Sequence, residues 1–266
     1  MTSRPLSEQD AVNRRIYSSS RLVLTYARRN LHPAELTVFE RFAGEFARAR
    51  VLELGCGAGR ITRHLVELSR SVVGIDVSPA MVDYCKRRVG NATFVVRDLR
   101  DLSPHDDASF EIVVGGQNVL DAVSHEERLD ALKEIRRTLT PGGLLYFSSH
   151  NRNSTDALAA ACRGPQFRLA KNPYRQARAA MSYVQGRRNH PRLSDLQRFE
   201  SDYALLNDEA HGWRLLHYYI DRTTQERQLA NVGFTLLEVI APDGRVLESQ
   251  EDDTGYTELH YVARSH

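Results

Sequence analysis

The hydrophobic pattern of the first 150 residues alternates between two kinds of segment. Leu36, Phe39, Phe42 and Phe46 recur at helical spacing, which predicts one amphipathic helix over residues 34–46. Beyond it, continuous apolar runs typical of buried strands are separated mainly by segments with helical spacing. The predicted strands are 51–54, 71–77, 92–98, 110–116 and 142–150, and the predicted helices are 60–68, 80–89 and 125–139.

The spacing of these elements predicts the class of fold. Strands and helices alternate at intervals that leave room only for parallel crossover connections. The pattern resumes late in the chain with a helix that ends at Gly233 and two strands, 234–242 and 258–264. We therefore expect an α/β, Rossmann-like, doubly wound domain with a mostly parallel seven-stranded sheet.

The alternation of strands and helices stops after position 150 and resumes near position 222. Within this interval, residues 203–207 and 214–220 have the pattern of a β-hairpin around a glycine-bearing stretch. The interruption predicts a cap-like insertion between strands five and six. We expect an N-terminal helical lid (1–33), a cofactor-binding core (34–150 and 222–266) and an inserted substrate-binding cap (151–221).

Composition narrows the class of protein. The 266 residues are 41% apolar and 26% charged, near the averages of globular proteins. A formal net charge of +2 gives no global reason to expect a nucleic acid or membrane partner. The sequence shows no long apolar run and no leader-type N-terminus, and its three scattered cysteines indicate reduced thiols. We expect a cytoplasmic monomer or homodimer.

The predicted cap is strongly basic, although the whole chain is nearly neutral. Basic residues recur from Arg152 to Arg198, where only Asp156 and Asp195 are acidic. This excess favours an anionic acceptor molecule, but a solvated helical face would give the same pattern. Nucleic acid is not expected as the partner, because few aromatic residues stand among the arginines to stack on bases.

The stretch VLELGCGAGR, residues 51–60, has the glycine spacing of a ligand-binding loop. Three alternating glycines remove side chains where the first predicted strand ends. A dinucleotide fingerprint needs a small residue where Arg60 stands, and a P-loop needs a following Gly-Lys-Ser/Thr. Neither condition is met. What remains is an acid-x-G-x-G-x-G loop, with Glu53 as the acid.

At four places the sequence resembles the class I S-adenosylmethionine-dependent methyltransferases of small-molecule type. The motifs are VLELGCGAGR, GIDVSPAMVDYCKRR, FVVRDLRDL and LTPGGLLYFSSHN, in this order and at the spacing of that family. Together with the closing strands, the resemblance covers residues 40–150 and 223–266. It implies S-adenosylmethionine as the cofactor, S-adenosylhomocysteine as the product and methyl transfer as the activity.

The resemblance also implies a set of cofactor-binding residues. Asp76, at the end of the second predicted strand, is placed to accept hydrogen bonds from the two ribose hydroxyls. Asp98 corresponds to the acid that binds the adenine amino group, with Asp101 as the competing acid, and Val77 and Met81 would enclose the adenine ring. For Met81 and for the N-terminal tyrosines, ordinary helix packing is the alternative. The implied set is Tyr17, Tyr26, Glu53, Gly55, Gly57, Gly59, Asp76, Val77, Met81, Asp98, Leu99 and Gln117.

The methyl-transfer site is expected beyond the ends of the later strands. His150 ends the fifth predicted strand and His217 lies in the predicted hairpin, so either can serve as general base or be a structural residue. Asn118, Asp121 and Tyr219 are predicted to contact the acceptor. We predict no metal, although Asn118 and Asp121 leave a divalent ion open.

The function expected from these features is methyl transfer from S-adenosylmethionine to an oxygen or nitrogen atom of a small molecule or peptide-like natural product, in biosynthesis. One alternative is an RNA or tRNA methyltransferase, which would carry a continuous positive surface around the mouth of the site. Another is a cofactor-binding regulator without transfer activity, which would have no polar group within reach of the methyl.

Overall fold

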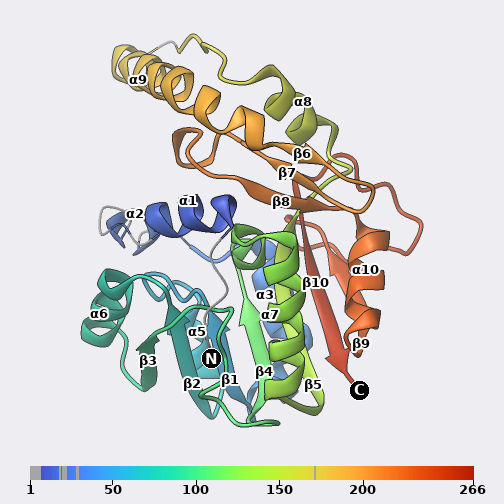
Figure 1. Cartoon of the computed structure of the whole chain (residues 1–266). Coiled ribbons are helices and arrows are strands. Elements are labelled where there is room, and N and C mark those ends of the chain that lie inside the picture. Colours follow the sequence, from blue (N-terminus) through green and yellow to red (C-terminus); the bar gives the residue numbers. More distant parts are fainter. Residues whose placement is uncertain (1–6, 18, 20–22, 28–29, 171) are drawn as a thin grey trace.

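Seven strands form the central part of the sheet in this computed structural model, which describes residues 7–17, 19, 23–27, 30–170 and 172–266. They are β1 (Arg50–Leu54), β2 (Ser71–Asp76), β3 (Ala92–Val96), β4 (Phe110–Gly115), β5 (Leu139–Asn151), β9 (Phe234–Ile240) and β10 (Glu258–Ser265). Strands β3, β2, β1, β4 and β5 are parallel neighbours in that order. β10 lies antiparallel between β5 and β9 (Figure 1). The predicted Rossmann-like doubly wound fold is confirmed.

Helices cover both faces of this sheet. They are α3 (Pro33–Arg41), α4 (Ala43–Phe46), α5 (Thr62–Leu68), α6 (Pro79–Arg88), α7 (His125–Thr138) and α10 (Arg222–Asn231), with a short 3-10 turn, η2 (Val119–Ala122), before α7. The buried side chains of α7 and α10 pack in one cluster, and those of α3, α4 and α5 pack in a second cluster on the other face. α7 has glutamates in its first turn and arginines in its last, which complements the helix dipole.

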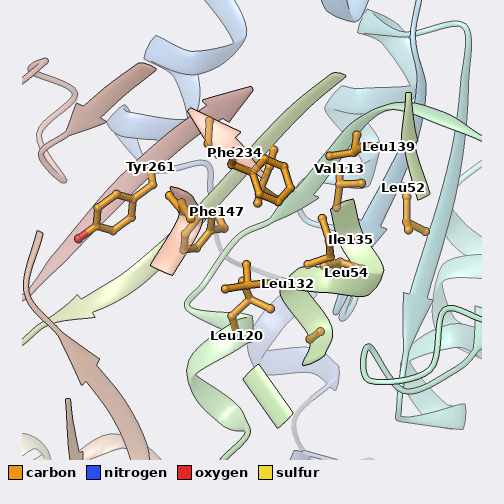
Figure 2. Packing of buried hydrophobic residues seen from close by; sticks show 14 of the residues in the cluster. Leu52, Leu54, Val113, Leu120, Leu132, Ile135, Leu139, Phe147, Phe234 and Tyr261 are labelled. Atoms are coloured by element: carbon orange, nitrogen blue, oxygen red, sulfur yellow. The ribbon is translucent and has the colours of Figure 1, made fainter. Parts of the chain in front are cut away.

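Aliphatic and aromatic side chains fill the space between the sheet and α7. Figure 2 shows Ile135 of α7 beside Val113 of β4, Leu132 of α7 beside Leu120, and Phe147 of β5 beside Phe234 of β9. These side chains are at most 1% exposed. Since each fully buried large apolar side chain contributes about 1.5–3 kcal/mol, this layer fixes the strands whose carboxyl ends carry the site.

The segment between β5 and α10 adds three strands to the sheet. Its elements are α8 (Thr155–Arg163), α9 (Pro173–Asn189), η3 (His190–Arg192), η4 (Ser194–Leu196), β6 (Arg198–Phe199), β7 (Ala204–Leu206), η5 (Ala210–Gly212) and β8 (His217–Ile220). β8 pairs with the end of β5 through His150↔Tyr219 and Asn151↔Ile220, and the predicted hairpin is the antiparallel β7–β8 pair. β5 continues beyond its last pairing with β4, at Phe147, and this extension accepts β8. The sheet therefore has ten strands rather than the seven predicted.

Two helices precede the core, α1 (Glu8–Tyr17) and α2 (Val23–Ala27). Asn13 of α1 donates hydrogen bonds to the carbonyls of Ala122 and Leu216, at 2.8 and 2.7 Å. α1 therefore bridges the core and the segment between β5 and α10. Residues 1–6, 18, 20–22, 28 and 29 of the predicted N-terminal lid lie outside the described residues.

Two local predictions need correction. The single helix predicted over residues 34–46 is interrupted at Phe42, which has φ −108°, and Leu36 is 47% exposed instead of facing the core. The interruption lets Phe39 and Phe46 meet edge to face at 5.3 Å, so packing overrides helical continuity. The third strand ends at Val96, two residues before the predicted end. Among the described residues, no helix is both long enough and apolar enough to cross a bilayer.

Candidate active site

A pocket lies at the carboxyl ends of β1, β2 and β4. It contains about 1100 Å³ of empty space including its open mouth, and its walls come from the glycine loop, the ends of the strands and α1. Ligand sites of open α/β sheets lie at this edge. Of the predicted cofactor residues, the pocket is lined by Tyr17, Tyr26, Glu53, Gly55, Gly57, Asp76, Val77, Met81, Asp98, Leu99 and Gln117.

The three glycines of the loop all have positive φ, but they serve different purposes. A Cβ at Gly57 would meet only the Gly55 carbonyl, at 3.9 Å, so this backbone is open to a ligand. A Cβ at Gly59 would lie 2.9 Å from Val89 Cγ2, and Gly59 does not line the pocket. Gly59 thus lets the loop pack against the chain after α6, and its predicted part in holding the cofactor stays a prediction.

Two carboxyl groups mark the floor of the pocket. Glu53 is 2% exposed and accepts a hydrogen bond from Thr62 Oγ1 at 2.5 Å. Burial raises the pKa of Glu53 to about 8, although the Thr62 hydrogen bond and Arg60 oppose the shift. Asp76 accepts the backbone N–H groups of Gly57 and Ser78, both at 2.8 Å. Burial also raises the pKa of Asp76, and these two N–H groups counteract part of the effect.

The arginine that excludes a dinucleotide fingerprint has a structural partner. Arg60 is 4% exposed and forms a bidentate ion pair with the fully buried Glu35 of α3, at 2.5 and 2.6 Å. It also donates to the Asn30 carbonyl at 3.1 Å. Arg60 therefore ties α3 to the end of the glycine loop, at the place where a dinucleotide-binding loop keeps a small residue.

The predicted adenine side of the pocket is lined by Val77, Met81, Asp98 and Leu99. Met81 is 3% exposed and packs with Val23 of α2, as the alternative of ordinary helix packing expects. It also forms part of the pocket wall. The Asp98 carboxylate is held by the Arg100 guanidinium, at 2.9 and 2.6 Å. Burial would raise the pKa of Asp98, but the hydrogen bonds and charge of Arg100 outweigh burial and lower it.

The two N-terminal tyrosines connect the pocket to histidines. The Tyr17 hydroxyl lies 3.0 Å from His217 Nε2, and the Tyr26 hydroxyl lies 3.1 Å from His211 Nε2. On the opposite wall, Gln117 Nε2 lies 2.9 Å from His32 Nε2. Tyr17 is thus the one described side chain that both lines the pocket and contacts a predicted catalytic histidine.

His217, at the start of β8, is held by a carboxylate from the preceding turn. Its Nδ1 lies 2.7 Å from Asp208 Oδ2, which also accepts the Tyr219 hydroxyl at 2.9 Å. Burial would raise the pKa of Asp208, but the charge and hydrogen bond of His217 outweigh burial and lower it strongly. Because an ionised carboxylate only accepts, the hydrogen bond to Asp208 places a proton on Nδ1, and Nε2 faces the Tyr17 hydroxyl.

His150, at the end of β5, forms a second pair of the same kind. Its Nδ1 lies 2.7 Å from Asp121 Oδ2, and its ring stacks on His217 with centroids 4.9 Å apart. Burial would lower the pKa of His150, but the hydrogen bond and charge of Asp121 outweigh burial and raise it. Asn118 contacts His150 Nε2 at 3.2 Å and donates to Glu258 at 2.7 Å.

Two of the predicted acceptor residues, Asp121 and Tyr219, are buried. Asp121 is fully buried, pairs with Arg128 at 2.5 Å and accepts from Ser149 at 2.7 Å. It supports His150 from behind, and its predicted contact with the acceptor stays a prediction. Tyr219 is 3% exposed, and its hydroxyl supports Asp208.

His150, Asp208 and His217 are the one group of described residues whose ligand atoms lie near enough, within 4.8 Å of one another, to be considered for a metal. Both histidine Nδ1 atoms already meet carboxylates at 2.7 Å. The Nδ1 atoms of both histidines therefore already have carboxylate partners, in two hydrogen-bonded His–Asp pairs. We assign no ion to this cluster.

Sequence reasoning missed Asp208, Glu258 and Arg100. Asp208 lies two residues beyond β7, and Leu206 is paired with His217 across the hairpin. A polar residue just beyond the strand opposite a candidate histidine was the signal that could have found it. Glu258 and Arg100 gave no comparable signal, because their partners are distant in sequence or belong to the same turn.

A parallel sheet in this strand order, with a glycine loop and an acid at the end of β2, defines the class I methyltransferase fold. Residues 51–143 match the family model described as a methyltransferase domain. A solved structure from Burkholderia thailandensis, a 1,6-didemethyltoxoflavin-N1-methyltransferase with bound S-adenosylhomocysteine, superposes with a TM-score of 0.58. The superposition covers 99% of this chain and 93% of that chain, at 18% identity. The predicted resemblance to class I S-adenosylmethionine-dependent methyltransferases is confirmed, and with it S-adenosylmethionine as the cofactor of that family.

Curated relatives match about half of the chain. A malonyl-[acyl-carrier protein] O-methyltransferase from Enterobacter lignolyticus is 30% identical over 148 residues, which are 56% of this chain and 57% of that protein. A ubiquinone biosynthesis O-methyltransferase from Acinetobacter baylyi is 24% identical over 136 residues, which are 49% of this chain and 56% of that protein. The chain thus spans about half the length of these curated relatives.

Proposed function

We propose that this chain transfers a methyl group from S-adenosylmethionine to an oxygen or nitrogen atom of a small-molecule or peptide-like acceptor. The observation that carries the proposal is the pair of stacked histidines, His150 and His217, each held by a carboxylate and linked to the pocket through Tyr17. A cofactor-binding regulator without transfer activity has no need of two such pairs.

The pocket fits the cofactor on features of its own. The open backbone at Gly57 accommodates the amino acid end, and Asp76 offers carboxylate oxygens at the end of β2 for ribose hydroxyls. Val77, Met81 and Leu99 supply apolar walls for a purine ring. When bound, the cofactor supplies an electrophilic sulfonium methyl group.

His217 has the geometry of a general base. Asp208 holds the proton on Nδ1, so Nε2 is the atom that takes up a proton. The Tyr17 hydroxyl lines the pocket and lies 3.0 Å from Nε2, so it passes its proton to Nε2 as it takes one from the acceptor. The positive charge that then develops on the imidazole lies 2.7 Å from the Asp208 carboxylate, which stabilises it. The remaining task of the protein is to hold acceptor and methyl in line, which supplies a large part of the rate.

The acceptor is proposed from the chemistry of the relatives and of the inserted segment. The relatives named above act, by their names, at oxygen in two cases and at nitrogen in one. The arginines of residues 151–221 support an anionic acceptor, and we propose that this segment is the acceptor-binding cap and residues 1–33 the lid. Biosynthesis in the cytoplasm, by a monomer or homodimer, completes the proposal.

Calorimetric titration with S-adenosylmethionine, and separately with NADH, tests the assignment of the pocket. We expect micromolar binding of the first alone. Asp76→Asn should weaken that binding about tenfold or more, because hydrogen bonds to a charged group contribute about 1.5–3 kcal/mol. Asp83→Asn, an exposed position on α6, is the matched control and should leave affinity unchanged. NADH binding without S-adenosylmethionine binding would contradict the proposal.

A further inference from the structure

The outer face of α9 exposes apolar side chains in a row. Tyr174, Met181 and Val184 are 71%, 63% and 47% exposed, and Ala177 between them is also exposed. Steps of three or four residues place these four side chains on one side of the helix. We call Tyr174, Ala177, Met181 and Val184 the apolar stripe of α9. Exposed large apolar residues grouped in this way mark an interaction site more often than isolated ones do.

The inner side of the same helix is already packed. A Cβ at Gly186 would lie 2.7 Å from the Trp213 ring and 3.0 Å from Pro165, so this side rests closely on its own segment. Asn189, at the end of α9, donates to the Gly212 carbonyl at 2.8 Å. The apolar stripe therefore faces away from the packed side, at the outer rim of the molecule at the top of Figure 1.

Arginines accompany the apolar stripe. By helical geometry Arg188 lies within the stripe and Arg178 and Arg187 lie on either side of it, whereas Arg175 lies nearer the side of Gly186. All four are exposed, and none forms an ion pair with any residue that the structure describes. In the sequence, eight basic residues and no acidic one stand between Asp156 and Asp195. These eight are Arg163, Arg168, Lys171, Arg175, Arg178, Arg187, Arg188 and Arg192.

We propose that the outer face of α9 binds the surface of an anionic lipid bilayer, with the apolar stripe in the interface and the arginines at the level of the headgroups. A helix with an apolar strip flanked by cations and no acids is the arrangement that lies in a membrane interface. Each arginine near an anionic surface strengthens binding about fivefold. RNA would use the same cations but gain nothing from Ala177, Met181 and Val184, so the stripe favours lipid.

This surface is distinct from the pocket and goes beyond the proposed function. It is nevertheless joined to the catalytic segment, because His190, next to α9, contacts Asn207 at 2.7 Å and Asn207 precedes Asp208. Binding through α9 would therefore hold the segment that carries Asp208 and His217 next to the bilayer. The result would be an enzyme that works at a membrane surface without spanning it.

Co-sedimentation with lipid vesicles tests the proposal on the full chain. We expect binding to phosphatidylcholine vesicles that contain phosphatidylglycerol, little binding to pure phosphatidylcholine, and a decrease with added salt. Arg178→Gln with Arg188→Gln should reduce binding about tenfold to thirtyfold. Met181→Ser with Val184→Ser should reduce it about tenfold although the charge is unchanged.

A matched variant separates local from global charge. Arg48→Gln with Arg70→Gln removes two exposed arginines next to the amino ends of β1 and β2, with the same change in net charge. It should bind vesicles like the unmodified chain. Equal loss in this control overturns the proposal, as does binding of an RNA oligonucleotide or an acidic protein without any vesicle binding. Calorimetric titration with S-adenosylmethionine reports separately whether each variant is folded and whether the pocket is intact.

Discussion

Glu53 is a carboxylic acid that burial keeps protonated near neutral pH. Its pKa is raised from 4.5 to about 8, so between these values the folded chain retains a proton that the unfolded chain has lost. The free energy of unfolding therefore falls as pH rises through this window, with a slope of about 1.4 kcal/mol per pH unit at most. The contribution of the protonated Glu53 to the free energy of unfolding is complete only below pH 4.5.

Glu53→Gln should remove this dependence, because the amide stays neutral and can still accept from Thr62. As pH rises from 5.5 to 8.5, we expect the free energy of unfolding of the variant to increase relative to that of the unmodified chain. Urea denaturation at several pH values measures it. Parallel pH profiles for the two proteins would show that Glu53 does not titrate as described.

The pair of His217 and Asp208 has a kinetic signature. His217→Gln and Asp208→Asn should each lower kcat about 10²–10⁴-fold, the range that general base catalysis contributes, and leave S-adenosylmethionine affinity nearly unchanged. The measurement is steady-state kinetics on an acceptor identified by screening, beside calorimetry. His64→Gln, at an exposed position on α5, is the matched control. Full activity of both variants would remove His217 from the reaction.

Some features of single residues could be predicted from the sequence and others could not. The strand-end positions of Asp76 and His150 follow from the apolar runs before them, so their places in the sheet could be predicted. The partners of the histidines could not, because Asp208 reaches His217 through the geometry of a hairpin turn and Asp121 reaches His150 through η2. The burial of Asp121 also depends on Arg128, whose own contacts with Ser149 and Gln225 are distant in sequence and follow no local pattern.

Among the elements, α1 has an unusual means of attachment. It is held by buried polar contacts, since Gln9 and Asn13 are 5% and 1% exposed and both donate to the Leu216 carbonyl. Asn13 Oδ1 also accepts the Leu216 N–H at 3.1 Å. Asn13 therefore fixes the position of α1 specifically, because its loss would leave the backbone groups of Ala122 and Leu216 without hydrogen-bond partners.

Asn13→Ala should release α1 without unfolding the core. We expect the free energy that holds α1 on the core to fall by about 1–3 kcal/mol, so that amide hydrogen exchange in α1 accelerates. Cofactor affinity should also fall, because α1 lines the pocket. Exchange in β1 and β4 should be unaffected. Arg15→Ala, on the exposed side of α1, is the control and should change neither quantity. Unchanged exchange in α1 would mean that other contacts hold the helix.

Elements were predicted best where packing and local preference agree. The strands β1 to β5 were predicted because each is an apolar run, and α7 was predicted as a long helix that ends before Pro141, Gly142 and Gly143. In the structure its acidic first turn and basic last turn also favour this helix. The region from 34 to 46 was predicted as one helix because spacing alone cannot show that Phe39 and Phe46 meet each other across a break. β6 to β8 extend the sheet through an edge that only the length of β5 creates.

At the scale of the whole molecule, one buried ion pair joins four elements. Asp121 of η2 and Arg128 of α7 are both fully buried, and Arg128 also donates to Gln225 of α10 at 2.7 Å and to Ser149 of β5 at 3.2 Å. Asp121 itself carries His150. Stability of the core and orientation of a candidate catalytic residue thus depend on the same carboxylate.

Asp121→Ala should lower the free energy of unfolding by about 3–5 kcal/mol, because it leaves the Arg128 guanidinium buried without a counter-charge. Urea denaturation monitored by circular dichroism measures the loss. The double variant Asp121→Ala with Arg128→Met should recover part of it, since no uncompensated charge then remains. If the double variant is no more stable than Asp121→Ala, the ion pair is not the source of the loss.

The pairing of β5 with β8 has a consequence for how proteins of this architecture diversify. The chain leaves the core at Asn151 and returns at Ile220, and these two residues are direct neighbours in the sheet, so their backbones lie about 4.8 Å apart. A segment whose two ends touch can be replaced by another of different length without displacing what remains. If the segment binds the acceptor as proposed, exchange of one continuous stretch of gene between such junctions would change the acceptor and leave the cofactor pocket intact. The same two positions are where a chimera should be cut.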